Sequence, residues 1–232
     1  MSAVKRFKIE PQCENVEVFL YYQTMITYLT SDIHFPDVHH ANPDGLLAVG
    51  GDLSTERLIL AYKSGIFPWF EKNQPILWWS PDPRFVLFPE KLKVSKSMKQ
   101  VLRQSDFVVT MNQDFKAVIT ECAKTKRTGQ RGTWITHSMI EAYIKLHEEG
   151  VAKSVEVWQD NWLVAGLYGV DLNNGIFCGE SMFTMVSNAS KAGFISFIQN
   201  TNYKLIDCQV YTNHLASLGA EEISREDFLG FL

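Results

Sequence analysis

Two acidic residues lie within apolar segments of this 232-residue chain, and both are candidates for chemistry. Asp207 stands in the run LIDCQ, and Glu180 stands between Phe177 and Phe183. A carboxylate is costly to bury in such surroundings unless it has a partner. Gln209 follows Asp207 at i+2, so in a regular strand the two side chains share one face. By residue type, Asp207, Gln209 and Glu180 are able to transfer a proton or bind a cationic group. The alternative is that each acid is tied to a neighbouring group for structural reasons.

Aromatic and apolar residues near these acids could hold a substrate. Trp69 lies in the segment GIFPWF and Trp134 in GTWIT, and a tryptophan face stacks on a nucleic-acid base with about 1–3 kcal/mol. Phe177, Met182 and Leu167 are candidates for an apolar pocket, with further aromatic residues nearby at Phe183, Phe194 and Phe197. Packing in the ordinary core is the alternative for each of these side chains.

The charge balance argues against strong general affinity for nucleic acids. The chain has 22 basic and 26 acidic side chains and a net charge of −4, whereas such affinity comes from basic residues that neutralise phosphates. A local basic face is still compatible with this balance, because two basic clusters occur. They hold Lys91, Lys93, Lys96, Lys99 and Arg103 in the first, and Lys124, Lys126, Arg127 and Arg131 in the second. A solvated surface is the alternative for both.

Several classes of protein are disfavoured by the sequence. The four cysteines, Cys13, Cys122, Cys178 and Cys208, are widely spaced, so we expect reduced thiols and no metal site. The longest apolar stretch, residues 16–29, is too short and too polar for a membrane helix. No signal peptide, Gly-rich nucleotide motif or Walker loop occurs. We therefore expect a cytoplasmic protein without a nucleotide cofactor.

The elements that must position these residues change in character near residue 82. Residues 1–82 are rich in turns and contain one amphipathic helix over 54–63, which predicts a small N-terminal α/β domain. Residues 83–232 alternate between strand and helix patterns and predict a second, catalytic domain. Its expected strands cover 85–88, 107–111, 154–158, 162–170, 176–183 and 204–210, and its expected helices cover 95–103, 114–123, 137–149 and 188–200. This order predicts an α+β fold with a mixed sheet flanked by helices, as in GNAT-type acyltransferases, and not a doubly wound sheet. In the GNAT-like fold the third and fourth strands part, and an acyl donor enters the gap.

Six segments carry runs of uncommon residues such as Trp, Cys and Met. They are NPDGLLAVGGDL at 42–53, GIFPWF at 65–70, WWSPDPR at 78–84, GTWIT at 132–136, FCGESMF at 177–183 and LIDCQV at 205–210. Through these segments, about four-fifths of the chain resembles the bacterial leucyl/phenylalanyl-tRNA–protein transferases. Enzymes of that family transfer Leu, Phe or, less efficiently, Met from tRNA to proteins that begin with Arg or Lys. The product is marked for degradation by the N-end rule pathway. Their catalytic domain is GNAT-like and uses no metal or organic cofactor.

The resemblance implies roles for the residues singled out above. Asp207 and Gln209 would serve catalysis or acceptor binding, and Glu180 would lie in the active centre, where a carboxylate suits a cationic amine. The donor side chain would bind to Phe177, Met182 and Leu167. The terminal adenosine of the tRNA would lie beside Trp69 and Trp134. Phosphate contacts would come from Lys96, Lys99 and Arg103, near one face of a predicted helix. The implied partners are aminoacyl-tRNA and proteins or peptides with N-terminal Arg or Lys, and we expect a monomer.

The implied reaction makes modest demands on the protein. The aminoacyl ester is already activated, so no ATP site is needed. The nucleophile is an α-amine, whose ordinary pKa is about 7.7–8.0. A carboxylate within hydrogen-bond reach, directly or through a water or an amide, contributes a factor of about 10²–10⁴. An apolar pocket distinguishes one methylene by only about 1–3 kcal/mol, so use of Leu, Phe and Met together is physically expected.

Two other functions are compatible with the pattern. A CoA-dependent GNAT enzyme would need a pyrophosphate-binding Gly-rich turn before the helix at 188–200, and the segment SNASKAG at 187–193 lacks that turn. A non-catalytic relative that binds tRNA or N-terminal peptides would not need Glu180, Asp207 and Gln209 together. Two departures from the family pattern concern the ends of the chain. The first 20 or so residues have no counterpart, and the short C-terminus is expected to affect stability or tRNA contact.

Overall fold

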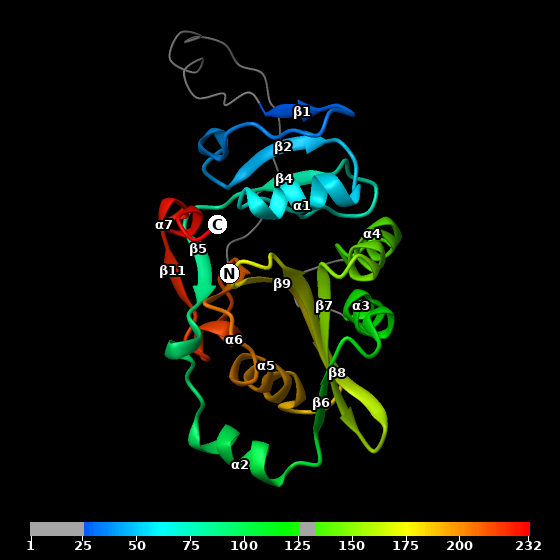
Figure 1. The fold of residues 1–232 in the computed structure, drawn as a ribbon, viewed down its shortest axis with the longest axis vertical. Coiled ribbons are helices and arrows are strands. Elements are labelled where there is room, and N and C mark those ends of the chain that lie inside the picture. The colour runs from blue at the N-terminus through cyan, green and yellow to red at the C-terminus, as the bar shows by residue number, and fades with distance from the viewer. Residues whose placement is uncertain (1–25, 126–132) are drawn as a thin grey trace, which may run out of the picture.

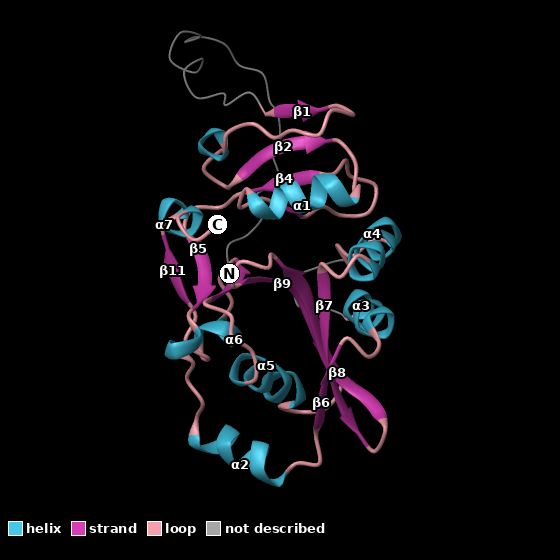
Figure 2. Ribbon diagram, in the orientation of Figure 1, coloured by secondary structure: helices cyan, strands magenta, loops and turns pink. Residues whose placement is uncertain are grey.

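A computed structural model of the chain describes residues 26–125 and 133–232. It contains two sheets of four and seven strands (Figure 1). In the four-stranded sheet, β1 (Thr27–Leu29) pairs in parallel with β2 (Leu46–Gly50). The strand β4 (Leu77–Trp79) lies antiparallel between β2 and β3 (Phe67–Pro68). This sheet and α1 (Thr55–Lys63) form one end of the molecule (Figures 1 and 2).

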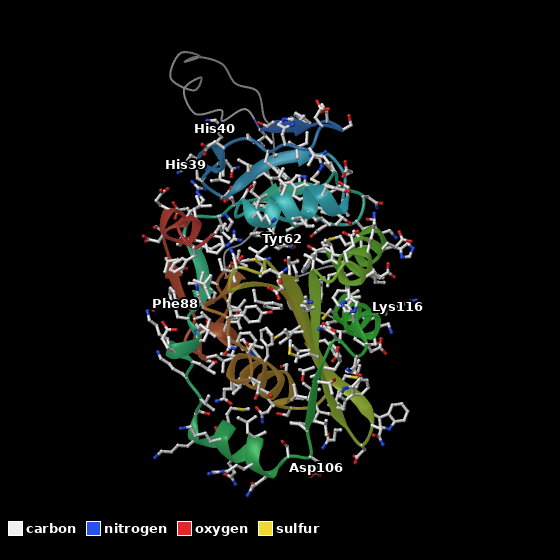
Figure 3. The ribbon with its side chains drawn as sticks, in the orientation of Figure 1. His39, His40, Tyr62, Phe88, Asp106 and Lys116 are labelled. Atoms are coloured by element: carbon white, nitrogen blue, oxygen red, sulfur yellow. The ribbon has the colours of Figure 1, made fainter. Side chains whose placement is uncertain are left out.

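The helix α1 begins and ends as its sequence predicts. The hydroxyl oxygen of Ser54, the N-cap, accepts a hydrogen bond from the Arg57 N–H. Gly65 follows the helix with a φ of 73°, the left-handed conformation that glycine adopts without steric cost. The buried face of α1 includes Tyr62, which lies on the side of the helix toward the larger sheet (Figure 3).

The seven-stranded sheet has the order β11-β5-β10-β9-β8-β7-β6. These strands are β5 (Arg84–Leu87), β6 (Val108–Met111), β7 (Ala152–Gln159), β8 (Trp162–Asp171), β9 (Ile176–Thr184), β10 (Leu205–Gln209) and β11 (Glu221–Ile223). Neighbouring strands are antiparallel except β9 and β10, which are parallel. The sheet is therefore mixed, as the sequence predicts.

Helices cover both faces of this sheet. The helices α3 (Phe115–Lys124) and α4 (His137–Glu148) lie on one face, and α5 (Ala189–Gln199) lies on the other (Figure 1). Strand residues alternate between them: Leu167 packs in the cluster with α5, and Tyr168 packs in the cluster with α3 and α4. The helix α2 (Lys96–Gln104) packs on α5 at the end of the molecule away from the four-stranded sheet. Shorter elements are α6 (Asn213–Ala216), α7 (Arg225–Leu229) and two 3-10 turns, Val38–His40 and Pro89–Lys91.

The expected elements all occur, each within about two residues of its predicted ends. No helix in the described ranges is long and apolar enough to cross a membrane.

The domain boundary predicted near residue 82 falls between β4 and β5, which belong to different sheets. One apolar cluster nevertheless includes residues on both sides of that point, such as Trp78 and Val86.

The gap in the larger sheet lies elsewhere than expected. The third and fourth strands after residue 83, β7 and β8, pair along their whole length, so the prediction that they part is wrong. The strands that part are β9 and β10. They pair from Leu205–Ile176 to Asp207–Cys178, after which β9 continues to Thr184 paired with β8 but no longer with β10.

The cause of the parting is a bend in β10. Its register with β5 shifts between Asp207 and Gln209, and Gln209 has a φ of 63°. The regular i, i+2 alternation predicted for Asp207 and Gln209 is therefore wrong, because a bulge interrupts the strand between them. A non-glycine residue in the left-handed region is uncommon and is held there by its surroundings.

Candidate active site

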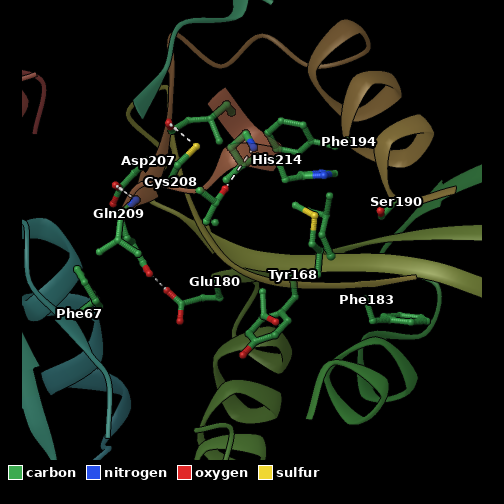
Figure 4. A pocket seen from close by; sticks show the side chains of 18 of the residues that line it. Phe67, Tyr168, Glu180, Phe183, Ser190, Phe194, Asp207, Cys208, Gln209 and His214 are labelled. Atoms are coloured by element: carbon green, nitrogen blue, oxygen red, sulfur yellow. Dashed lines mark hydrogen bonds between the residues drawn. The ribbon is translucent and has the colours of Figure 1, made fainter. Parts of the chain in front are cut away.

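A cavity of about 620 Å³ lies where β9 and β10 part (Figure 4). It is lined by residues from β3, β8, β9, β10, α5 and α6. Eight residues predicted from the sequence line it: Trp69, Trp134, Leu167, Phe177, Glu180, Met182, Asp207 and Gln209. Segments that are far apart in the sequence are thus brought together around a single space.

Glu180 is held by three neutral hydrogen-bond donors. The Tyr62 hydroxyl and the Gln209 Nε2 donate to its Oε1 at 2.7 and 2.6 Å, and the Tyr143 hydroxyl donates to its Oε2 at 3.1 Å. The two tyrosine hydroxyls also contact each other, and because each carries a single proton, one of them shares its proton between Glu180 and the other hydroxyl. Within residues 26–125 and 133–232 Glu180 has no cationic partner. In the same ranges no group of three or more His, Cys, Asp or Glu side chains could hold a metal ion.

Burial and hydrogen bonds set the protonation of Glu180 and of the two tyrosines. Burial raises the pKa of Glu180 to about 7, and the hydrogen bonds from Tyr62, Gln209 and Tyr143 only partly oppose this. Burial also raises the pKa of Tyr62 and of Tyr143 well above the usual tyrosine value, so both remain donors. A carboxyl group with a pKa near neutrality is suited to exchange a proton with an amine.

Asp207 has a different environment, because it forms a buried ion pair. Arg84 donates from Nε to Oδ1 at 2.8 Å and from Nη2 to Oδ2 at 2.7 Å, and both side chains are almost fully buried. The remaining Arg84 nitrogen, Nη1, donates to the carbonyl oxygen of Gly65 at 3.1 Å. Burial alone would lower the pKa of Arg84, but the charge and hydrogen bonds of Asp207 raise it. The immediate contacts of Asp207 are thus those of an anchored charge.

Asp207 also fixes the conformation of Gln209. The Gln209 backbone N–H donates to Asp207 Oδ1 at 2.9 Å across the bulge. This contact holds Gln209 in its left-handed conformation, from which its side-chain amide reaches Glu180 (Figure 4). The order of contacts is therefore Arg84 to Asp207, Asp207 to Gln209, and Gln209 to Glu180.

The apolar part of the cavity lies on the α5 side of the sheet. Leu167 and Met182 are partners across β8 and β9, and Phe177 lies on β9 as well. Phe177 also packs against Phe197 at 4.7 Å between ring centroids, so it serves the core as well as the cavity wall. Additional apolar residues of this wall are Phe194, Ile206 and Leu215, whereas Phe183 lines the cavity from the cluster on the α3 and α4 side.

The two predicted tryptophans differ in exposure. The Trp69 side chain is 39% exposed, and its ring lies 5.9 Å from that of Trp79. The Trp79 Nε1 donates to the carbonyl oxygen of Trp69 at 2.7 Å, which fixes the backbone there. Trp134 is half-buried beside the core. Both residues line the cavity.

The basic residues predicted to bind phosphate do not line the cavity. Lys96, Lys99 and Arg103 are exposed on α2, at the end of the molecule opposite the four-stranded sheet (Figure 1). Their spacing of three and four residues places them near one face of that helix. In the second basic cluster, Lys124 forms an ion pair with Glu121 at 2.7 Å. Its other members, Lys126, Arg127 and Arg131, lie outside the described residues.

Three residues of the site were not anticipated from the sequence. Tyr62 and Tyr143 lie on helical patterns where an aromatic residue indicates only core packing. Arg84 carried a signal, because it is a basic residue at the start of a strand whose next residues, Phe85 to Leu87, are apolar. A buried cation in such a strand requires an anion, and Asp207 is the acid of β10, one of the two strands paired with β5.

Comparison with known proteins places the chain in a family. The family model described as leucyl/phenylalanyl-tRNA protein transferase matches residues 86–232, and the model of that family's N-terminal domain matches residues 51–82. A leucyl/phenylalanyl-tRNA–protein transferase of Flavobacterium johnsoniae is 59% identical over 208 residues, which cover 88% of this chain and 98% of the relative. One of Pseudomonas aeruginosa is 51% identical over 214 residues, which cover 90% and 94%. Among solved structures, a GCN5-related N-acetyltransferase from Kribbella flavida aligns with 12% identity and a TM-score of 0.37, over 70% of this chain and 58% of the other. The chain belongs to the leucyl/phenylalanyl-tRNA protein transferase family and is an aminoacyltransferase.

Proposed function

We propose that this enzyme transfers Leu or Phe, and Met less efficiently, from aminoacyl-tRNA to the α-amine of proteins that begin with Arg or Lys. The observation that carries the proposal is the composition of the cavity. One space joins an apolar wall, two tryptophans and the hydrogen-bonded pair Glu180–Gln209. The apolar wall suits an uncharged donor side chain, the tryptophans suit the terminal adenosine, and Glu180 suits the incoming amine. Such a product would be marked for degradation in the cytoplasm, and the enzyme would act as a monomer.

In this proposal Glu180 accepts the proton that the acceptor ammonium loses. Its pKa of about 7 lies just below the ordinary pKa of an α-amine, about 7.7–8.0, so the transfer between them is nearly balanced. The free amine attacks the ester carbonyl, and a new C–N bond forms. The C–O bond to the ribose of the tRNA then breaks, and the leaving oxygen takes up the second proton of the amine. Gln209, whose Nε2 donates to Glu180, retains an amide oxygen that can accept a hydrogen bond from the ammonium.

The two alternatives are less well supported. A CoA-dependent acyltransferase would use a Gly-rich turn before α5, whereas α5 follows Asn188, which has a φ of 66° and no side-chain capping bond. A binding protein without catalysis would not need a buried Arg84–Asp207 pair that holds Gln209 against Glu180. The contacts that hold Gln209 against Glu180 therefore favour a catalytic enzyme over a binding protein.

A transfer assay tests the proposal. The protein is incubated with radiolabelled leucyl-tRNA and a peptide that begins with Arg, and label in the peptide is measured. The matched controls are the same peptide with an acetylated N-terminus and a peptide that begins with Asp. We expect label only in the peptide with a free N-terminal Arg. Equal label in all three peptides, or none in any, would contradict the proposed function.

A further inference from the structure

Arg84 contacts two aromatic rings in addition to its anionic partner. Its guanidinium carbon lies 4.8 Å from the centre of the Phe67 ring and 4.6 Å from the centre of the Phe228 ring. Phe67 lies on β3 and lines the cavity. Phe228 lies on α7 and is 1% exposed, and it is not among the residues that line the cavity. The last helix of the chain thus contacts the cation that holds Asp207.

The two rings complete the environment of a buried cation. Nε and Nη2 of Arg84 are directed to Asp207, and Nη1 is directed to Gly65. These hydrogen bonds use three of the five guanidinium N–H groups, and the guanidinium carbon lies over both rings. A ring face attracts a cation by about 0.5–2 kcal/mol, more when water is excluded, and it restricts rotation of the plane. The orientation of Nε and Nη2 of Arg84 toward Asp207 therefore depends on the two rings as well as on the carboxylate.

The helix α7 is fixed at several points, so Phe228 cannot easily move away from Arg84. Arg225 donates from Nη1 to the Ser80 carbonyl at 2.8 Å and from its backbone N–H to Asp82 Oδ1 at 3.0 Å. Glu226 pairs with Nε2 of His39 at 3.2 Å. Leu229 packs so close to Gly65 that a side-chain carbon at Gly65 would lie 2.9 Å from it. These contacts tie α7 to segments that precede Arg84 in the sequence, from His39 to Asp82.

We propose that Phe228 is a positioning residue for aminoacyl transfer. It holds the plane of Arg84, Arg84 holds Asp207, and Asp207 holds the bend of β10 that brings Gln209 to Glu180. Phe228 does not touch the reacting atoms and acts only through this series of contacts. The inference rests on the proposed function, since its readout is the transfer rate.

A double-mutant cycle tests the inference. Phe228→Leu keeps an apolar side chain of similar size but removes the ring face. We expect kcat for transfer of Leu to an Arg peptide to fall by about three- to thirtyfold, the equivalent of one lost cation–π contact, while KM for leucyl-tRNA stays within about twofold. In a Gln209→Ala background the same substitution should have no further effect on kcat, because the contact at the end of the series is already absent.

Phe231→Leu is the matched control. Phe231 lies in the same terminal segment, is 43% exposed, and contacts Phe88 edge to face with 5.8 Å between ring centroids. We expect kcat of the Phe231→Leu variant to equal that of the wild type. The inference is overturned if Phe228→Leu leaves kcat unchanged. It is also overturned if Phe228→Leu lowers kcat by the same factor with and without Gln209, because the effects of two independent substitutions on kcat multiply. Absence of transfer by the wild type would instead contradict the proposed function.

Discussion

The two carboxylates of the cavity, those of Glu180 and Asp207, differ in the groups that surround them. Asp207 is paired with a guanidinium and accepts the Gln209 backbone N–H, so its oxygens are engaged. Glu180 accepts only from neutral hydroxyl and amide groups, and burial raises its pKa to about 7. Acids with such different environments are expected to take different roles. In the proposed function Glu180 exchanges a proton, and Asp207 holds the strand that carries Gln209.

At the scale of single residues, we predict that Asp207→Asn lowers the rate of transfer far more than the affinity for charged tRNA. The substitution leaves Arg84 without its charge partner and releases the bend at Gln209. Breaking such a buried pair costs about 3–5 kcal/mol of stability, so the measurement uses a temperature at which circular dichroism shows the variant to be folded. Single-turnover transfer and tRNA binding are measured side by side. A folded variant with a transfer rate within about twofold of wild type would make Asp207 purely structural.

At the scale of elements, the sequence predicted the strands and helices well because their signals are local. Apolar alternation and turn residues such as Asn173 to Gly175 define β8 and β9 within one or two residues. The bend of β10 was not predicted, because it depends on a backbone contact to Asp207, whose carboxylate is fixed by an arginine 123 residues away in the sequence. The convergence of Tyr62 and Tyr143 on Glu180 has the same origin. It requires α1 and α4 to pack against one another, which no short pattern specifies.

The paired positions Leu167 and Met182 give a prediction about the donor pocket. Met182→Ala should enlarge the pocket and reduce use of Leu more than of Phe, because the larger ring still reaches the far wall. Leu167→Trp should fill it and reduce use of Phe more than of Leu. Burial of such a side chain contributes about 1.5–3 kcal/mol, so loss of half the contact changes donor use roughly tenfold.

The measurement is the ratio of transfer efficiencies for leucyl- and phenylalanyl-tRNA in each variant, with one acceptor peptide throughout. If both ratios equal the wild-type value in folded variants, these two residues belong to the core and the donor side chain binds elsewhere.

At the scale of the whole molecule, the cavity is assembled from all parts of the fold. The N-terminal segment contributes Trp69 to the cavity wall and the Tyr62 hydroxyl as a donor to Glu180 of the seven-stranded sheet. Phe228 of α7 contacts Arg84 outside the cavity wall. The basic residues of α2 lie at the opposite end from the N-terminal sheet (Figure 1). A bound tRNA would therefore have to extend along the molecule to reach both the cavity and α2.

This arrangement predicts a salt dependence. Affinity for charged tRNA should fall with salt, and Lys96→Ala with Lys99→Ala should flatten the log–log slope by about 0.7–0.9 for each lost phosphate contact. The matched control is Lys116→Ala with Lys145→Ala, which removes two exposed lysines from α3 and α4. An unchanged slope in the α2 variant would contradict this placement of the RNA and would direct attention to the cluster from Lys124 to Arg131.

The most direct test of the whole account is the pH dependence of single-turnover transfer by the wild type and by Glu180→Gln. Glu180 can accept a proton only when ionised, so the wild-type rate should be low below its pKa of about 7 and rise as pH increases through that value. The Gln variant keeps the shape of the side chain but cannot accept the proton. We expect the rate of this variant to be lower by about 10²–10⁴ at pH 7. Its rate should rise only as the acceptor ammonium loses its proton, near pH 8. A folded variant with the wild-type rate and the wild-type pH profile would contradict the central claim that Glu180 deprotonates the attacking amine.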